Sequence, residues 1–215
     1  DSTKTWLLEN GSKTRVSNED SQTINPYASF TGYCFRKYLN TADFPSRRSG
    51  INFIYMRYAE VLLIYAEAKI ENEDIDQSVL DAINKVRARA YGVNPSQTDQ
   101  YPVISKTDQT ELREIIRRER EIELAGEGFR LFDIRRWEIA EYVMPGNFLG
   151  RPKGDFGIIP NAPAFNQYGE PQYGTNESLY RIVETRTFDP ERDYLWPIPQ
   201  KEMDVNDELV QNPGY

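Results

Sequence analysis

The sequence contains no histidine and only one cysteine in its 215 residues. The absence of histidine excludes Ser-His catalytic triads, the commonest general base and the most frequent zinc ligand. A single cysteine excludes an internal disulfide. Because this cysteine, Cys34, stands among Tyr33, Phe35 and Tyr38, we interpret it as a buried structural thiol rather than a reactive one.

Long hydrophobic runs and an excess of positive charge are also missing. No stretch of about 18 apolar residues occurs, so no segment is predicted to cross a membrane as a helix. The 34 acidic residues outnumber the 26 basic ones, and the net charge of −8 disfavours binding to nucleic acid or to an anionic membrane surface. Aromatic residues, in contrast, make up 13% of the chain, and we expect some of these rings at the surface, where they suit recognition.

The first half of the chain predicts a loop-rich entry followed by a helical hairpin. Residues 1–50 are polar and turn-rich, which indicates mostly loop with short strands. Residues 54–71 predict a buried helix, because apolar side chains cover more than half of its helical wheel. A second helix, predicted from about residue 78 to Gly92, has a narrower apolar stripe and is expected to be more exposed. The narrow polar stripe of the first helix consists of Glu60, Glu67 and Glu71.

A second hairpin is predicted before an irregular C-terminal layer. Asp108 and Glu111 offer a capping-box-like start for a third helix, and a fourth helix is predicted over residues 129–142. Residues 144–197 hold six of the 13 glycines and seven of the 13 prolines, so residues 143–215 are predicted to form an ordered, irregular layer, with a hairpin near 180–188 and a docked tail. The sequence therefore predicts one mainly α domain of TPR-like antiparallel helix pairs with a large loop-rich layer and few short strands.

Two glutamates stand where a buried helix face should be apolar. On a helical wheel, Glu119 and Glu123 fall in the middle of the face that apolar residues form. Those apolar residues are Leu112, Ile115, Ile116 and Ile122. Buried carboxylates need partners, and we expect a structural ion-pair network with Arg87, Arg130 and Arg136. A catalytic carboxylate pair of a glycoside hydrolase is the alternative, but side chains one turn apart on a packed helix leave no cleft between them.

Four blocks of the sequence resemble the SusD/RagB family. The predicted first helix contains RYAEVLLIYAEA at residues 57–68, and the second contains INKVRAR at residues 83–89. The third block is EREIELAGEGFRLFDIRRW at residues 119–137. The tail carries PIP at residues 197–199 and QNPGY at residues 211–215. Four blocks in the family's order are far more specific than any single motif.

The resemblance implies a lipid-anchored protein on the outer face of a Gram-negative outer membrane. Such proteins bind oligosaccharides or other nutrients, hand them to a SusC-like TonB-dependent transporter, and are not enzymes; no cofactor or metal is expected. Family members are usually more than twice this long. We therefore expect the N-terminal half of the fold, with its signal peptide and lipidated cysteine, to precede residue 1 and to cover the apolar first helix.

Three aromatic residues are the predicted glycan-binding residues, because sugars stack their C–H faces on rings while polar side chains bind the hydroxyls. Trp6, Tyr27 and Phe30 lie in the polar segment before the first helix, where a ring has the weakest structural role. A TPR-like docking module for a protein partner, without its own glycan site, is the alternative function. An exposed ring platform favours the sugar hypothesis, and a free concave helical groove favours the docking hypothesis.

Overall fold

The computed structural model describes residues 4–9, 12–17, 28–43, 49–153 and 162–215, and it is mainly helical with few short strands, as predicted. The chain divides into two compact units. We call Asn40–Val143 with Phe165–Pro171 the helical unit. The strand unit consists of Asp1–Leu39, Met144–Ala164 and Gln172–Tyr215.

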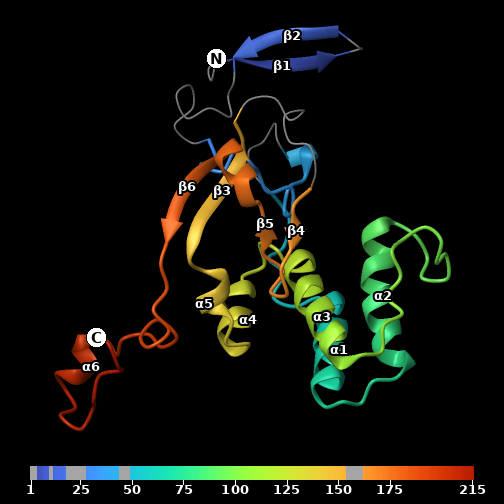
Figure 1. Ribbon diagram of the computed structural model, residues 1–215. Coiled ribbons are helices and arrows are strands. Elements are labelled where there is room, and N and C mark those ends of the chain that lie inside the picture. Colours follow the sequence, from blue (N-terminus) through green and yellow to red (C-terminus); the bar gives the residue numbers. More distant parts are fainter. Residues whose placement is uncertain (1–3, 10–11, 18–27, 44–48, 154–161) are drawn as a thin grey trace. The chain divides into compact units, whose positions relative to one another are not determined.

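Three helices build the core of the helical unit: α1 (Tyr58–Glu71), α2 (Gln77–Tyr91) and α3 (Gln109–Glu123) (Figure 1). Helix α1 packs against both of the others. Their buried apolar side chains recur every three or four residues, so each helix turns one face inward. The shared core contains Leu63, Ala66, Ile70, Val79, Leu80, Ala82, Ile83, Val86, Leu112, Ile116 and Leu124.

Local capping signals mark both ends of α2 and the start of α3. The Oδ1 atom of Asp76 accepts a hydrogen bond from the Ser78 N–H at 2.9 Å at the start of α2. The same atom of Asp108 accepts from the Glu111 N–H at 2.9 Å at the start of α3. Gly92 ends α2 with φ of +72°, a left-handed conformation that costs glycine little. The boundaries predicted at Asp108 and Gly92 are therefore confirmed.

The relative burial of the first two helices differs from the prediction. Seven of the 15 residues of α2 are buried, whereas α1 buries five of 14. Apolar residues surround most of α1, but its contacts with α2 and α3 cover only one of its sides. The rest of its apolar surface therefore stays exposed. The side chains of Tyr58, Val61, Ile64 and Tyr65 remain exposed among the described residues. Two residues of the acidic stripe, Glu60 and Glu67, are buried, whereas Glu71 is exposed.

The segment predicted as one fourth helix consists of two short ones. Helix α4 (Arg130–Arg136) and helix α5 (Ala140–Val143) are separated by Glu138, whose φ is +52°. This left-handed residue cannot continue a right-handed helix. The Trp137 N–H still bonds the Asp133 carbonyl at 3.0 Å, so α4 ends immediately before the break.

Short strands and turns make up the strand unit. Strands β1 (Lys4–Glu9) and β2 (Ser12–Ser17) are antiparallel neighbours. Strand β3 (Gly146–Pro152) pairs with β6 (Tyr180–Arg186), so β6 bonds a distant strand instead of forming the local hairpin predicted near 180–188. The other short elements among the described residues are η1 (Thr41–Asp43), which belongs to the helical unit, β4 (Ala164–Phe165), β5 (Pro171–Gln172), η3 (Gly174–Leu179) and α6 (Gln200–Met203).

The C-terminal tail folds back on the segment before α6. The Gln211 side chain accepts from the Ile198 N–H at 2.8 Å and donates to the Ile198 carbonyl at 3.0 Å. The Asn212 amide donates to the Trp196 carbonyl at 2.6 Å, and the Tyr215 hydroxyl donates to the Leu195 carbonyl at 3.1 Å. These side-chain bonds replace the regular backbone ladder that the segment lacks.

The environment of the single cysteine differs from the sequence interpretation. Cys34 is exposed, and the neighbouring rings of Tyr33 and Phe35 are 56% and 69% exposed. Nearby aromatic residues in the sequence indicate burial only where a helix or strand packs them inward, and this segment has no such regular element. The interpretation of Cys34 as a buried thiol was therefore wrong.

Candidate functional site

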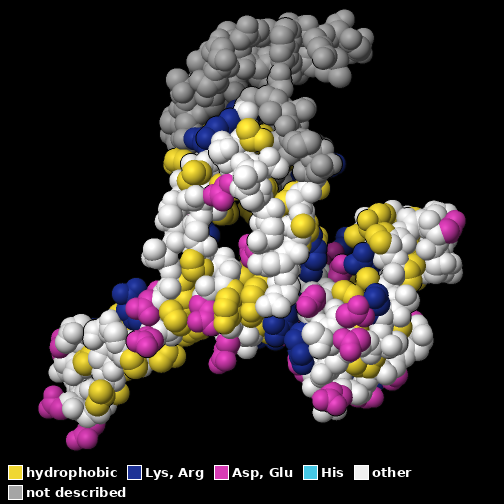
Figure 2. All heavy atoms as spheres, in the orientation of Figure 1, with side chains coloured by type: hydrophobic (Ala, Val, Ile, Leu, Met, Phe, Trp, Pro, Cys, Tyr) yellow, Lys and Arg dark blue, Asp and Glu magenta, His cyan; other side chains and the backbone are white. Residues whose placement is uncertain are grey.

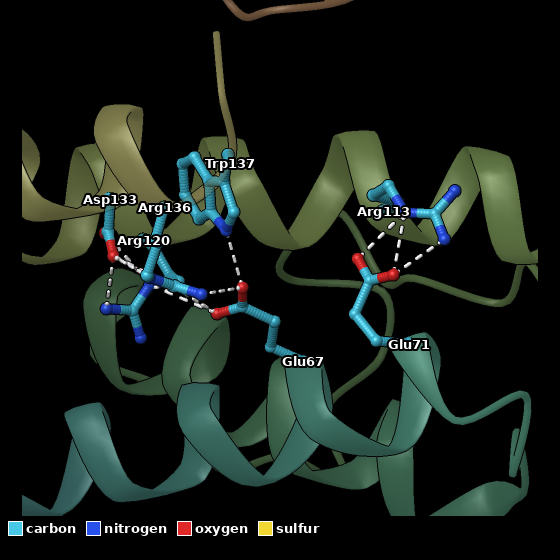
Figure 3. A network of polar contacts seen from close by, with 7 residues as sticks. All are labelled: Glu67, Glu71, Arg113, Arg120, Asp133, Arg136 and Trp137. Atoms are coloured by element: carbon cyan, nitrogen blue, oxygen red, sulfur yellow. Dashed lines mark hydrogen bonds and ion pairs between the residues drawn. The ribbon is translucent and has the colours of Figure 1, made fainter. Parts of the chain in front are cut away.

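The most buried polar cluster of the helical unit lies between α1, α3 and α4 (Figure 3). On α1, Glu67 is only 6% exposed. Its carboxylate accepts from Nη1 and Nη2 of Arg136 at 2.5 and 2.7 Å, and from the indole Nε1 of Trp137 at 2.6 Å. A bidentate guanidinium and an indole donor together satisfy most of what this carboxylate loses on leaving water.

A second carboxylate completes the cluster. Asp133, 4% exposed, accepts from Nε and Nη2 of Arg120 at 3.0 Å each and from Nε of Arg136 at 2.9 Å. The Nε atom of Arg120 also lies 3.5 Å from the Glu67 carboxylate. Two acids and two bases therefore alternate, and their charges cancel. Such an arrangement stabilises the contact between helices only while every partner is present.

A further set of ion pairs joins the start of α1 to the end of α3. Arg57 donates through Nε and Nη2 to the Glu127 carboxylate at 2.8 Å each, and through Nη1 to Glu123. Arg89 of α2 donates to the same Glu123 carboxylate. Although burial lowers the pKa of Arg57, its hydrogen bonds to Glu127 and Glu123 outweigh that effect and hold the pKa above its ordinary value.

The structure places the five predicted network residues in four different clusters. Arg87 of α2 donates to Glu119, while Glu123 contacts Arg57 and Arg89 instead of the predicted arginines. Burial raises the pKa of Glu119 despite the nearby Arg87 charge.

The two other predicted arginines lie elsewhere. Arg136 joins the Glu67–Asp133 cluster. Arg130 contacts Glu121 at 3.3 Å and Glu170 at 3.1 Å. Arg130 and Arg136 therefore bind carboxylates that the wheel analysis had not selected.

One of the three buried residues of α3 is an arginine. Leu112, Ile116 and Arg120 are the buried residues of this helix, while Ile122 is 59% exposed. The spacing of four residues from Leu112 through Ile116 points directly to position 120. That spacing could have identified Arg120 as a buried residue. The partners of Glu67 could not be found from the spacing within one helix, because they come from α3 and α4.

The predicted glycan-binding rings lie in the strand unit. Phe30 is 65% exposed. Trp6 lies in β1, where its backbone faces Arg15 of β2, and its side chain is outside the described part of the structure. Tyr27 lies outside the described residues. Sequence reasoning did not select the ring of Trp196, which is 60% exposed.

A pair of tyrosine rings in the helical unit was also not selected. Tyr142 and Tyr168 stack with centroids 4.7 Å apart and an interplanar angle of 8°. Tyr142 is 54% exposed, so one ring of the pair contacts solvent. Phe165 lies close by in the sequence, with the Arg118 guanidinium 3.5 Å from its ring centroid.

The polar clusters are suited to holding helices together rather than to catalysis. The carboxylates of Glu67, Asp133 and Glu123 are each engaged by arginine, so none of these three is free to act as a general acid or base. Asp133 pairs with two arginines, Arg120 and Arg136. Within the described residues, no group of three or more cysteine, aspartate and glutamate side chains is arranged to hold a metal ion.

Comparisons with known proteins agree with the sequence blocks. The model of the SusD family matches residues 3–215. A SusD-like protein P2 from Formosa agariphila is 32% identical over 204 residues, which cover 89% of this chain and 34% of that protein. The chain therefore spans about a third of the length of this relative.

Solved structures of SusD-like proteins resemble the fold. One from Bacteroides fragilis has a TM-score of 0.54 at 28% identity and covers 76% of this chain and 26% of its own. A SusD homologue from Bacteroides thetaiotaomicron has a TM-score of 0.52 at 25% identity, and covers 98% of this chain and 39% of its own.

Proposed function

The chain belongs to the SusD family, whose members are non-catalytic binding proteins, and from this premise we propose that it binds an oligosaccharide or another nutrient at the cell surface. The bound nutrient would pass to a SusC-like TonB-dependent transporter. The observation that carries the proposal is the family match, which extends over residues 3–215 rather than over one motif.

The proposed location is the outer face of the outer membrane. In the described part of the chain, no helix is both long and apolar enough to cross a bilayer. We propose attachment through a lipid on the N-terminus of the full-length protein, as expected for the family. The net charge of −8 is consistent with a protein that does not adhere to an anionic membrane surface.

Ring stacking is the proposed mode of binding. Exposed aromatic faces bury the C–H surface of a sugar, and neighbouring polar groups bind its hydroxyls. Trp6, Tyr27 and Phe30 remain the proposed glycan-binding residues. The 65% exposure of Phe30 supports its availability to a ligand.

The proposal is tested by glycan binding to the full-length protein. A broad panel of oligosaccharides is screened first, and the best ligand is then titrated by calorimetry against Phe30→Ala and Trp6→Ala. Removing a stacking ring should weaken binding about tenfold. Phe53→Ala is the matched control, because Phe53 is similarly exposed at 70% but lies in the helical unit. Absence of saturable binding to every glycan would refute the function.

Docking of a protein partner is a second candidate function, favoured by one observation. The exposed apolar residues Phe53, Tyr55 and Met56 precede α1, whose outer side adds further exposed side chains. Those side chains are Tyr58, Val61, Ile64 and Tyr65. Apolar surface of this kind marks interaction sites. Co-purification of the full-length protein with a transporter, combined with failure of all glycans to bind, would favour docking as the main activity.

A further inference from the structure

The groove between α1 and α2 is lined by cations and apolar side chains. Its volume is about 660 Å³, within the range of small-ligand sites. None of the ten lining residues is acidic, although acids outnumber bases 34 to 26 in the whole chain. Three lining residues are basic: Arg57, Lys85 and Arg89. Figure 2 shows basic side chains beside apolar ones around α2.

The three cations of this groove are not equally available. Arg57 donates hydrogen bonds from all three of its guanidinium nitrogens to the carboxylates of Glu123 and Glu127. Arg89 donates to Glu123 through one nitrogen. Lys85 has no ion pair among the described residues. Its Nζ atom lies 5.0 Å from the ring centroid of Tyr58. The unneutralised charge of the groove is therefore at Lys85.

The start of α1 adds to the positive potential. Tyr58 and Ala59, the first two residues of this 14-residue helix, line the groove. No side chain caps this end, because the residue at the capping position is Arg57, which has no oxygen to accept a hydrogen bond. The partial positive charge of the helix N-terminus acts in the same direction as Lys85, and Glu60 in the first turn offsets part of it.

The remaining surface of the groove suits a ring with a polar edge. Tyr58 is 61% exposed and offers an aromatic face, and Asn94 offers an amide. Leu62, Val86, Val93 and Pro95 supply the apolar wall. A uronic acid residue presents a C–H face for the ring and the wall, hydroxyls for the amide, and a carboxylate at its edge for the lysine.

We propose that this groove binds an anionic sugar residue, with Lys85 as the cation that selects for the charge. The inference rests on the proposed glycan-binding function and defines the class of glycan: one that carries carboxylates, or sulfate esters of the same charge. Lys85 and Tyr58 form this subsite in the helical unit, whereas Phe30 belongs to the strand unit.

Calorimetric titration of the full-length protein tests the proposal with matched ligands. The probes are an oligogalacturonate tetramer, its carboxyl-reduced neutral counterpart, and a sulfated form of that counterpart. The uronate should bind more tightly than the reduced tetramer, and added salt should weaken only the charged ligands. If the sulfated tetramer binds as well as the uronate, the groove recognises charge; if it binds like the neutral one, it recognises the carboxylate.

Variants at Lys85 identify the groove as the place of binding. Lys85→Gln should weaken uronate binding about tenfold, since a charge-assisted hydrogen bond is lost, and should leave the reduced tetramer unaffected. Lys85→Glu should abolish uronate binding. Lys201→Gln, an exposed lysine on α6 of the strand unit, is the control and should change neither ligand. Circular dichroism checks that each variant keeps its helices.

Two results would overturn the proposal, and they differ in what they say about function. If neutral glycans bind and the uronate is not preferred, or if Lys85→Gln has no effect, the groove does not select an anionic sugar while the glycan-binding function stands. If no glycan of any kind binds, both the function and the subsite are refuted.

Discussion

At the scale of single residues, two glutamates on α1 offer a direct comparison of a buried and an exposed ion pair (Figure 3). Glu67 is buried against Arg136 and Trp137, whereas Glu71, one turn later, pairs with Arg113 at the surface. Glu67→Ala removes the partner of desolvated cations and should lower the free energy of unfolding by about 3 kcal/mol. Urea denaturation of the chain measures the change.

The control substitution for this comparison is Glu71→Ala. The Glu71 and Arg113 side chains are 41% and 30% exposed, so water replaces the lost partner and the cost should be within about 1 kcal/mol. Equal losses for the two substitutions would show that burial does not determine the contribution of these pairs.

Two carboxylates that share one arginine should make the helical unit sensitive to pH. Burial raises the pKa of Glu121 and of Glu170, and the single guanidinium of Arg130 offsets this only in part. A raised folded-state pKa means that the folded protein holds these protons more tightly than the unfolded chain. The stabilisation is thus complete below the ordinary glutamate pKa and is lost as pH rises through the folded values.

The replacement Glu170→Gln should therefore flatten this part of the pH dependence. The amide oxygen can still accept from Arg130, while the cost of a buried negative charge disappears. The variant should gain stability relative to the parent at pH 7 and lose that advantage towards pH 4. Denaturation curves across this range provide the measurement, and an unchanged difference between the two proteins at all pH values would contradict the assignment.

At the scale of elements, the end of α2 depends on one backbone conformation. Gly92 has φ of +72°, and no heavy atom lies within 4 Å of a Cβ built at this position. Gly92→Ala meets no steric obstacle, so its cost should be the conformational one alone, about 1 kcal/mol. Gly50→Ala is the matched control, because Gly50 has equally open space without a left-handed φ, and it should leave the free energy of unfolding unchanged.

The helix boundaries at Gly92 and Asp108 show which features could be predicted from the sequence. Gly92 and Asp108 act on their own neighbours, so a local pattern was enough to place both helix boundaries. The partners of Glu67 depend on which faces of α1, α3 and α4 meet, and no local pattern contains that information. The exposed fraction of Phe30 is also a tertiary property. The role of Phe30 in glycan binding therefore stays a prediction, whereas the helix boundaries at Gly92 and Asp108 are confirmed.

At the scale of the whole molecule, the exposed side of α1 gives the last prediction. The chain covers 34% of the length of the relative from Formosa agariphila, and we expect other parts of such relatives to cover the side of α1 formed by Val61 and Ile64 in the full-length protein. Val61 and Ile64 are 43% and 46% exposed here. Replacing both with glutamine should change the stability of the 215-residue chain by no more than about 0.5 kcal/mol per site.

The same double substitution should behave differently in the full-length protein. If a further layer packs on α1, the two polar side chains become buried without partners, and the loss should be about 1–3 kcal/mol for each. Val61 and Ile64 thus report on the covering of α1 without any knowledge of what covers it. Equal and small effects in both proteins would mean that this apolar side stays exposed, and the surface would then be available to a protein partner, as the docking hypothesis requires.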